Sequence, residues 1–392
     1  MSNINVLYRV KNITDDKILT VKNNCMKIQD NRPRSYSEKP KFKIYKKLNI
    51  FDSYCDNHTI YDTYFNPKIN MFLSNNLSTF STLLYGQTGS GKTYTLFGNN
   101  NTNGLTHHIL NFLLSKNIKL TVSALEIYNN TVSDIINHGY NIKVFDSGNN
   151  ISILNEIKKI HISDSTKIDT EIKKILYYRA SGKTKLNDTS SRSHLIISIN
   201  FSLNGVQKKI YLIDLAGTEK GKYSIVNSKQ DKLEKININK SLFALKECIR
   251  AFSNKNNYIP FRNSKLTILL KDAFFNNGFI VFVGTLNPLM KCYYDIIDTV
   301  EYGNSLSKVR IVIDINKKPS STMLLNHYLD YIMDINKQIR KDYKVYQKIS
   351  DDVKKKEYST KPSEYIDNIM PLFSNKINVI KKFYKEFEKY KE

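Results

Sequence analysis

The eight residues Gly86–Thr93 read GQTGSGKT and match the pattern G-x-x-x-x-G-K-[ST]. They follow Phe80–Tyr85, an apolar run typical of a buried strand, and precede a segment with helical character. A glycine-rich turn between a strand and a helix directs backbone N–H groups at one point where polyphosphate can bind. The pattern therefore predicts a polyphosphate site in which Lys92 reaches the phosphates and the Thr93 hydroxyl holds Mg²⁺. The residues expected to contribute are Gly86, Gln87, Thr88, Gly89, Ser90, Gly91, Lys92 and Thr93.

Short runs of β-branched and aromatic residues alternate with longer helical patterns along the chain. This alternation predicts an α/β fold of three layers, with a mostly parallel central sheet and helices on both faces. Nucleotide then belongs at the carboxyl ends of the strands. Thr20–Lys47 is basic and shows no clear pattern, so it is expected to form a long surface loop. The predicted strands are Ile4–Val10, Phe80–Tyr85, Leu120–Tyr128, Leu195–Leu203, Lys209–Leu215 and Gly278–Leu286.

The charge of the chain favours a polyanionic partner. Among 392 residues, 60 are Lys or Arg and 36 are Asp or Glu, which gives a formal net charge of +24. Nucleic acid, an anionic membrane and an acidic protein surface all fit such a field. The most apolar stretch, Phe279–Leu286, is too short to span a bilayer. The four cysteines are scattered without a C-x-x-C pair, so we expect a soluble intracellular protein with neither a disulfide framework nor a zinc site.

Two further clusters fit phosphate chemistry. In Tyr211–Glu219 an apolar strand ends at Asp214, which suits a carboxylate near Mg²⁺, and the Gly217 N–H is expected to be free to contact a terminal phosphate. In Asn187–His194, NDTSSRSH, hydroxyl groups lie beside Arg192, which could pair with Glu219. Such a group could bind a third phosphate and pass from an ordered to a disordered conformation when that phosphate is lost. Taken alone, the aspartate could equally be a helix cap and the serine cluster a polar turn.

The character of the sequence changes after Ile315. Lys317–Ser321 predicts a boundary, and a lysine-rich helical segment follows. Apolar residues recur every seven positions over 325–349, which fits either a short coiled coil or a helix folded back on the preceding domain, so homodimerisation stays open. The first seam contains Leu325, Ile332, Ile339 and Tyr346, and the second contains Tyr328, Ile335 and Ile349, with Asp342 interrupting the pattern.

In this order, GQTGSGKT, NDTSSRSH and DLAGTE resemble the phosphate loop and the two switch motifs of the kinesin motor family. Thr218 stands where that family usually has serine. The resemblance covers about residues 4–316, with further matching segments at Ala124–Ile136, Arg179–Asn187, Ile238–Ile249 and Ile259–Phe274. It implies a P-loop NTPase fold, a motor domain at 1–316 and a basic helical tail at 317–392.

The resemblance also implies an ATP hydrolase that uses Mg²⁺. Lys92 and Thr93 would bind the phosphates and the metal, with Ser191 and, through a water molecule, Asp214 completing the metal's surroundings. Adenine would lie near Arg9 and Tyr94, although Lys11 and Asn12 depart from the usual arginine and proline. Ser190 and Gly217 would line the γ-phosphate. Arg192 and Glu219 would form the salt bridge that closes the two switches.

Kinesins bind microtubules, so the resemblance assigns the positive charge an acidic protein partner rather than nucleic acid. It implies a location in the cytoplasm on the cytoskeleton, with the spindle as one site. The residues expected on the helices facing tubulin are Lys240, Lys246, Arg250, Arg262, Lys265 and Lys271.

The type of kinesin stays open at the level of sequence. Leu245–Ala251, LKECIRA, resembles the internal-motor, microtubule-depolymerising class known as kinesin thirteen. That class has a Lys-Val-Asp sequence at the tip of a loop, which Lys27–Asp30, KIQD, resembles only weakly. It also has a neck before the motor domain, for which the early start of the motor here is expected to leave no room. Tyr302–Asn316 instead resembles a last motor helix followed by a neck linker, as in a walking motor. The expectation is a microtubule-stimulated motor ATPase, with a depolymerase acting at filament ends and a non-catalytic microtubule-binding protein as alternatives.

Overall fold

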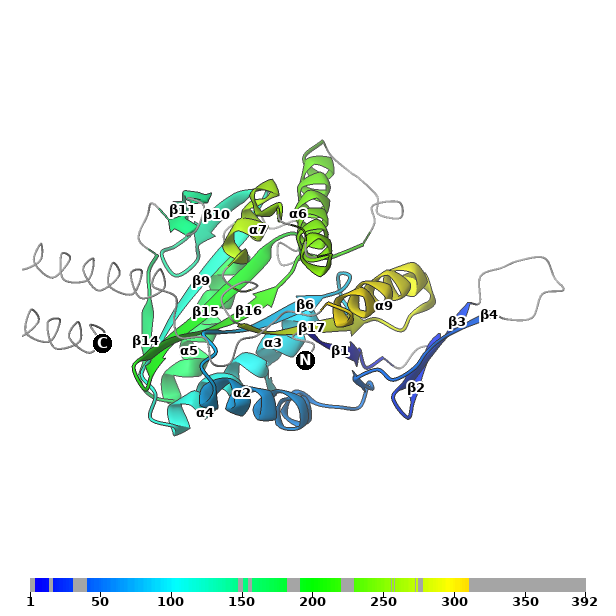
Figure 1. Cartoon of the computed structure of the whole chain (residues 1–392), viewed down its shortest axis with the longest axis horizontal. Helices are drawn as coiled ribbons and strands as arrows, with labels where there is room; N and C mark the ends of the chain where they lie inside the picture. The colour runs from blue at the N-terminus through cyan, green and yellow to red at the C-terminus, as the bar shows by residue number, and fades with distance from the viewer. Residues whose placement is uncertain are drawn as a thin grey trace, which may run out of the picture. The chain divides into compact units, whose positions relative to one another are not determined.

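A ten-stranded mixed sheet forms the centre of the computed structural model (Figure 1). The structure describes residues 4–13, 17–30, 41–146, 151–153, 157–181, 191–219, 229–254, 256, 258–271, 273 and 278–309. All of them belong to one compact unit, Met1–Ile315. The expected boundary at Lys317–Ser321, the neck residues from 310 to 316, the helical tail and the coiled coil at 325–349 lie outside the described residues.

The sheet has a parallel half and an antiparallel half. Strands β16, β6, β17, β1 and β5 are parallel neighbours, whereas the pairs from β16 to β11 are antiparallel. In spatial order the strands are β11 (Tyr140–Ile142), β10 (Thr131–Asp134), β9 (Leu120–Tyr128), β15 (His194–Leu203), β16 (Val206–Asp214), β6 (Thr79–Tyr85), β17 (Gly278–Leu286), β1 (Ile4–Val10) and β5 (Ile50–Phe51), and β14 (Ile160–Ile162) pairs with β9. All six predicted strands are therefore present, and the predicted α/β fold is confirmed.

Helices cover both faces of this sheet, as Figure 1 shows for α2 and α4 on one side and α6 on the other. One layer contains α1 (Asn57–Ile60), a π-helical turn at Tyr61–Phe65, α2 (Asn66–Ser74), α3 (Lys92–Phe97), α4 (Leu105–Ser115) and α5 (Thr166–Ser181). The other contains α6 (Lys229–Ser253), α7 (Lys265–Leu269) and α9 (Tyr293–Ser307), with short 3₁₀ turns at Phe261–Asn263 and Met290–Cys292. None of the helices in the described part of the chain is long and apolar enough to cross a bilayer.

Two hydrophobic cores result, one on each face of the sheet. On β17, Ile280 and Phe282 pack with the layer of α6 and α9, whereas Val281 and Val283 pack with the layer of α2 and α4. Successive side chains of a strand point to opposite faces, so a strand buried on both faces reads as a continuous apolar run. This explains why the central strands were recognisable from sequence. Burial of each large side chain stabilises the fold by about 1.5–3 kcal/mol.

The expectation of a surface loop at Thr20–Lys47 is wrong. A separate antiparallel sheet occupies most of the described part of this stretch, with strands β2 (Leu19–Lys22), β3 (Cys25–Asp30) and β4 (Lys41–Tyr45). Asn23 and Asn24 have positive φ angles of 50° and 58°, which fit a two-residue hairpin turn. On β3, Met26 and Ile28 are fully buried. The segment Lys27–Asp30, considered above for its weak resemblance to a loop tip, therefore lies in a strand.

Two small antiparallel pairs complete the described structure. They are β7 (Gly98–Asn99) with β8 (Thr102–Asn103), and β12 (Val144–Asp146) with β13 (Ile151–Ile153).

Candidate nucleotide site and its connection to helix α6

The predicted phosphate loop connects β6 to α3, at the carboxyl end of a parallel strand. Gly89 and Gly91 have positive φ angles of 75° and 100°, a conformation that residues with a Cβ rarely adopt. Lys92 opens α3 and is 6% exposed, with its Nζ donating to the carbonyl oxygens of Gly86 at 2.8 Å and Gln87 at 3.0 Å. Ser90 is also buried, and its Oγ donates to the Gln87 carbonyl at 2.7 Å. The loop thus curls around a lysine ammonium group held at its centre.

The loop also presents donors to a carboxylate. Thr88 donates from its backbone N–H to Glu219 Oε2 at 2.9 Å and from its hydroxyl to Glu219 Oε1 at 2.6 Å. Glu219 closes the second switch motif, so a side chain from that motif occupies donors of the phosphate loop. Donors that bind carboxylate oxygens in this way can also bind the oxygens of a phosphate group.

The residues expected near Mg²⁺ meet at the end of β16. Thr93 Oγ1 donates to Asp214 Oδ2 at 2.8 Å, and Arg179 Nη1 donates to the same oxygen at 2.8 Å. Asp214 Oδ1 is buried and has no hydrogen-bond partner among the described residues. A buried carboxylate oxygen left in this way fits a site that takes a metal-bound water. The donor set of the loop and this oxygen therefore fit ATP with Mg²⁺.

The expected ion pair between Arg192 and Glu219 is not the one that the structure forms. Arg192 Nη1 instead contacts Glu234 Oε2 of α6 at 2.5 Å, while Glu219 binds Thr88. Glu234 is 6% exposed and also accepts a hydrogen bond from the Tyr128 hydroxyl. A buried carboxylate needs such partners, because burial without them strongly disfavours its charge.

The Gly217 N–H, expected to contact a terminal phosphate, has a protein partner in this structure. This group donates to the Ser191 carbonyl at 2.8 Å, which joins the two switch motifs directly through their backbones. A buried N–H is costly without a partner, so the nearest carbonyl satisfies it. Ser191 is half-buried, and Ser190 lies outside the part of the chain that the structure describes.

The two residues expected near adenine lie together. The Arg9 guanidinium is 5.0 Å from the centroid of the Tyr94 ring, and Arg9 Nη1 donates to Thr95 Oγ1 at 2.8 Å and to the Asn57 side chain. Arg9 is 7% exposed, and burial lowers its pKa. Lys11, which departs from the family pattern, donates from Nζ to the Gly89 carbonyl of the phosphate loop at 2.9 Å. This lysine ties the first strand to the phosphate loop.

Three residues at this site had no role assigned from sequence: Arg179, Glu234 and His194. Arg179 lies in a matching segment, and Glu234 lies four residues before Ile238 on the inward face of α6, so both offered a weak signal. His194 belongs to the first switch motif and lies between that motif, the second switch and α6. Each depends on contacts between segments far apart in sequence, which local patterns do not report.

The six residues expected to face tubulin divide into two groups. Lys240, Arg250 and Arg262 are exposed, and Arg250 pairs with Glu247 on the same helix at 3.1 Å. The other three are half-buried and contact the protein itself: the Lys246 ammonium lies 4.9 Å from the Tyr302 ring centroid, Lys265 Nζ donates to the Val144 carbonyl at 2.7 Å, and the Lys271 ammonium lies 5.9 Å from the Phe261 ring centroid. In this structure only the first group presents its charge outward.

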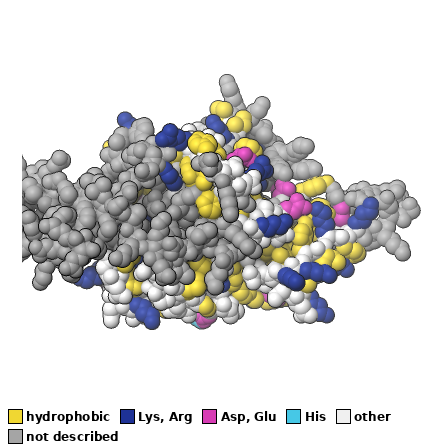
Figure 2. Space-filling model, viewed as in Figure 1, with side chains coloured by type: hydrophobic (Ala, Val, Ile, Leu, Met, Phe, Trp, Pro, Cys, Tyr) yellow, Lys and Arg dark blue, Asp and Glu magenta, His cyan; other side chains and the backbone are white. Residues whose placement is uncertain are grey.

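The outer face of α6 is both apolar and basic. Leu233, Ile236 and Phe243 are 51%, 51% and 64% exposed, and their spacing places them on the same side of the helix as Lys240 and Arg250. Figure 2 shows yellow hydrophobic and dark blue basic side chains close to one another in the region of α6 and α7. Large exposed apolar side chains grouped in this way indicate a binding surface.

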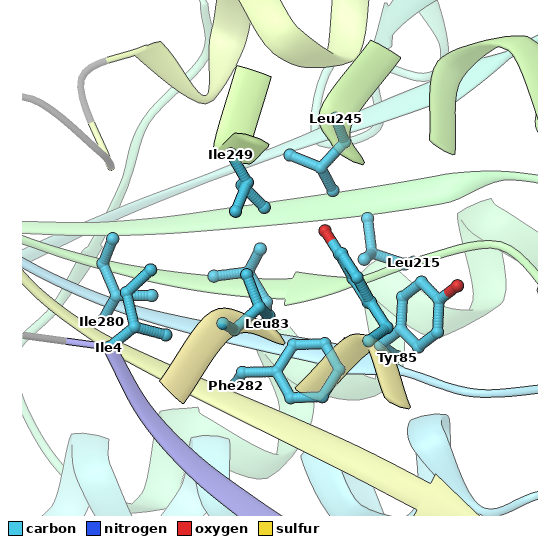
Figure 3. A pocket seen from close by; sticks show the side chains of 10 residues that line it. Ile4, Leu83, Tyr85, Leu215, Leu245, Ile249, Ile280 and Phe282 are labelled. Carbon is cyan, nitrogen blue, oxygen red and sulfur yellow. The ribbon is translucent and has the colours of Figure 1, made fainter. Parts of the chain in front are cut away.

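A small apolar pocket lies between α6, α9 and the sheet (Figure 3). The Tyr302 hydroxyl is buried there without a hydrogen-bond partner among the described residues. Leu306, near the end of α9, forms part of the wall, so the pocket lies where the expected neck linker begins. Its lining residues are Ile4, Leu83, Tyr85, Leu215, Leu245, Ile249, Ile280, Phe282, Tyr302 and Leu306.

Comparison with known proteins agrees with this geometry. The family model of the kinesin motor domain matches residues 8–309. Kinesin-like protein KIN-13B of Arabidopsis thaliana is 32% identical over 75% of this chain and 45% of its own length. Diatom spindle kinesin-1 of Cylindrotheca fusiformis is 32% identical over 58% of this chain and 37% of its own length. The chain thus spans less than half the length of either relative.

Solved structures support the fold. The structure of a fast kinesin aligns with a TM-score of 0.69 and 23% identity over 82% of this chain and 95% of its own. A KIF14 dimer, solved with AMP-PNP in complex with a microtubule, aligns with a TM-score of 0.69 and 21% identity over 81% of this chain and 98% of its own.

Proposed function

This chain belongs to the kinesin motor family, and from that membership we propose that it is a microtubule-stimulated ATPase that couples hydrolysis to force or movement on microtubules. One observation carries the proposal most directly. Helix α6 contacts the switch motifs on its inner side through Glu234 and Ser241, and its outer side presents exposed apolar and basic residues. A single rigid element of this kind can carry a change at the nucleotide site to a filament surface.

The nucleotide would be held by groups already placed for it. Lys92 would exchange the carbonyl groups of Gly86 and Gln87 for phosphate oxygens, and Arg9 and Tyr94 would pack beside the base. Thr93, Ser191 and Asp214 would hold Mg²⁺, Asp214 through a water molecule. Bound Mg²⁺ supplies positive charge that stabilises the transferring phosphoryl group.

Hydrolysis of this type depends on positioning more than on a strong base. The Gly217 N–H, now bonded to the Ser191 carbonyl, would turn to the γ-phosphate, with Ser190 beside the attacking water. Arg192 would exchange Glu234 for Glu219, and Glu219 would leave Thr88. This exchange would close the switches and release one attachment of α6.

The proposal is tested by ATPase assays with polymerised tubulin, free tubulin and DNA. We expect polymerised tubulin to raise the turnover rate, and Lys92→Ala to abolish turnover because it removes the ammonium group from the phosphate loop. Lys119→Ala, an exposed lysine before β9, is the matched control and should retain turnover. Turnover by the unaltered protein that does not respond to polymerised tubulin would contradict the proposal, and absence of turnover with retained filament binding would favour a non-catalytic microtubule-binding protein.

The exchange of ion pairs has its own test. Glu219→Ala should spare nucleotide binding and remove stimulation by microtubules, because Arg192 then cannot exchange Glu234 for Glu219. Full stimulation of this variant would show that the pair is not used.

Depolymerisation at filament ends is a second candidate function. It is favoured by the resemblance of Leu245–Ala251 on α6 to the internal-motor class and by the identity with a KIN-13 relative. Time-lapse imaging of stabilised microtubules with the protein and ATP separates the two. Directed movement supports a walking motor, whereas shortening from the ends supports a depolymerase.

We also propose that residues 1–316 form the motor domain and 317–392 a basic helical tail, with the chain acting in the cytoplasm on the cytoskeleton. Light scattering of the full chain and of a variant lacking 325–349 tests whether this segment forms a homodimer. A mass that does not change beyond the loss of that segment would argue against dimerisation through it.

A further inference from the structure

His194 links three segments of the nucleotide site. It is the first residue of β15 and is 2% exposed. The backbone N–H of Ala216, in the second switch motif, donates to His194 Nδ1 at 3.0 Å. On the other side of the ring, Nε2 lies 2.8 Å from Ser241 Oγ of α6, and that hydroxyl donates to the Ile238 carbonyl at 2.8 Å.

One protonation state satisfies all three hydrogen bonds. Nδ1 accepts from a backbone N–H, so it carries no proton, and in a neutral ring the proton then lies on Nε2. Ser241 donates its only hydrogen to Ile238, so its oxygen accepts from Nε2. Burial, together with the nearby positive charges of Arg179 and Lys92, lowers the pKa of His194 to about 3. The ring is therefore neutral at physiological pH and forms a directed chain from the second switch to α6.

The position of this chain on α6 gives it a specific mechanical role. Ser241 lies seven residues after Glu234, which is about two helical turns and therefore the same side of the helix. The Glu234 attachment is a charged ion pair that the proposed mechanism exchanges, whereas the His194 attachment is neutral. The helix is thus held at one point while a neighbouring point can be released.

We infer that His194 is a positioning residue that fixes α6 to the Ala216 peptide and so converts movement of the second switch into movement of the filament-binding helix. This inference rests on the proposed function, since it assigns the connection between hydrolysis and filament affinity. It involves no contact with the nucleotide. Loss of the ring should therefore affect communication more than nucleotide binding.

Two substitutions separate the two contacts of the ring. In His194→Asn the side-chain oxygen can still accept from Ala216, but the side chain is too short to reach Ser241. In His194→Gln the amide N–H can still reach Ser241. Ser241→Ala removes the second contact without changing the histidine.

The first experiment measures microtubule affinity of each variant in ATP-analogue and ADP states. We expect Ser241→Ala and His194→Asn to reduce the ratio of the two affinities by about fivefold or more, with nucleotide affinity of the free protein unchanged. His194→Gln should restore a large part of the ratio. The double variant His194→Asn/Ser241→Ala should be no worse than either single variant, because both break one chain. An unchanged ratio in Ser241→Ala, or additive losses in the double variant, would overturn the inference.

A second measurement needs no filament and therefore separates this inference from the proposed function. Hydrogen exchange at the Ala216 amide reports the first bond of the chain directly. Circular dichroism first establishes that each variant is folded. The Ala216 amide should then exchange faster in His194→Leu than in the unaltered protein, and Ser241→Ala should raise its exchange rate to a smaller extent. Equal protection in all three proteins would contradict the inference even if microtubule stimulation is observed, whereas absent stimulation with altered protection would affect only the proposed function.

Discussion

At the residue scale, the buried pair of Arg179 and Asp214 shows how the site is stabilised. The two side chains are 2% and 1% exposed, and Arg179 Nη2 also donates to the Ser193 carbonyl at 3.1 Å. Taking two charges out of water is expensive, so such a pair is stable only while both partners are present. Arg179 therefore holds Asp214 in place beside Thr93.

Removal of Arg179 should leave Asp214 as an unpaired buried charge. We expect Arg179→Met, which keeps much of the side-chain volume, to lower the free energy of unfolding by about 3–5 kcal/mol. Arg250→Met is the control, because Arg250 is 70% exposed and its pair with Glu247 contributes about 0–1 kcal/mol. Urea unfolding followed by circular dichroism measures both, and equal midpoints would contradict the role of the buried pair.

The buried neutral ring of His194 predicts a pH dependence of stability. The unfolded chain binds a proton at this position below about pH 6.5, whereas the native ring has a pKa of about 3. The unfolded state thus binds more protons between these values, so stability falls as pH is lowered, by up to about 1.4 kcal/mol per pH unit. His194→Gln should lose this part of the slope between pH 7 and pH 5, whereas His161→Gln, at an exposed histidine, should retain it. Identical slopes in all three proteins would show that another group controls the acid response.

Site residues were predictable where a local pattern carries the chemistry. The phosphate loop, Thr93 with Asp214, and Arg9 with Tyr94 are brought together as expected. The partners that Arg192 and Gly217 have in this structure were not predictable, because they depend on which of several nearby groups lies within hydrogen-bond distance in the folded chain. Glu234 offered one clue, since a carboxylate on the inward face of a helix requires a buried partner.

At the element scale, a lysine side chain from the sheet donates hydrogen bonds to the carbonyl groups at the end of a helix in the neighbouring layer. The last carbonyl groups of any helix lack partners within it. Lys208 of β16 donates from Nζ to the carbonyls of Phe72 at 3.0 Å, Asn75 at 2.7 Å and Leu77 at 2.8 Å, at and just beyond the end of α2. Burial lowers the pKa of Lys208 to about 8, so the ammonium is still the main form at pH 7.

Replacement of this ammonium should loosen α2. We expect Lys208→Met to lower the free energy of unfolding by about 1–3 kcal/mol, because it retains the apolar stem but leaves buried carbonyl groups unsatisfied. Lys209→Met is the matched control, since alternation along the strand places that side chain on the opposite face. Thermal unfolding and hydrogen exchange of α2 measure the effect. Protection of α2 that is the same in both variants would exclude Lys208 as its cap.

The elements that were missed have a common physical reason. Strands β2 and β3 are short and mix apolar residues, such as Val21 and Met26, with polar and charged ones, so they give little apolar signal. The Asn23–Asn24 pair was the usable signal, because asparagine tolerates the positive φ that a two-residue hairpin requires. The central strands, buried on both faces, had no such ambiguity.

At the scale of the whole molecule, the positive charge can be related to a surface. The formal net charge of +24 is distributed over the chain, but Lys240 and Arg250 present it on the exposed face of α6 beside apolar side chains. Exposed charges interact over about 8 Å at physiological salt. A filament partner held in this way should therefore bind through both salt-sensitive and salt-insensitive contacts.

Microtubule affinity should fall as the salt concentration rises, and it should fall less steeply in variants that lack a basic residue on the exposed face of α6. We expect Lys240→Ala and Arg250→Ala each to weaken binding by about twofold to fivefold at low salt and to reduce its salt dependence. Lys119→Ala, in the connection between α4 and β9, is the control. Co-sedimentation with microtubules at several salt concentrations measures this, and equal salt dependence in all variants would place the contact elsewhere.

Helix α6 touches the switch motifs with one side, and in the proposed function its other side binds a filament, an arrangement that thermodynamics makes reciprocal. By whatever factor a nucleotide tightens the grip of the motor on its track, the track must tighten the hold of the motor on that same nucleotide. If the proposed function holds, the filament is therefore an effector of the nucleotide site as well as a surface on which work is done.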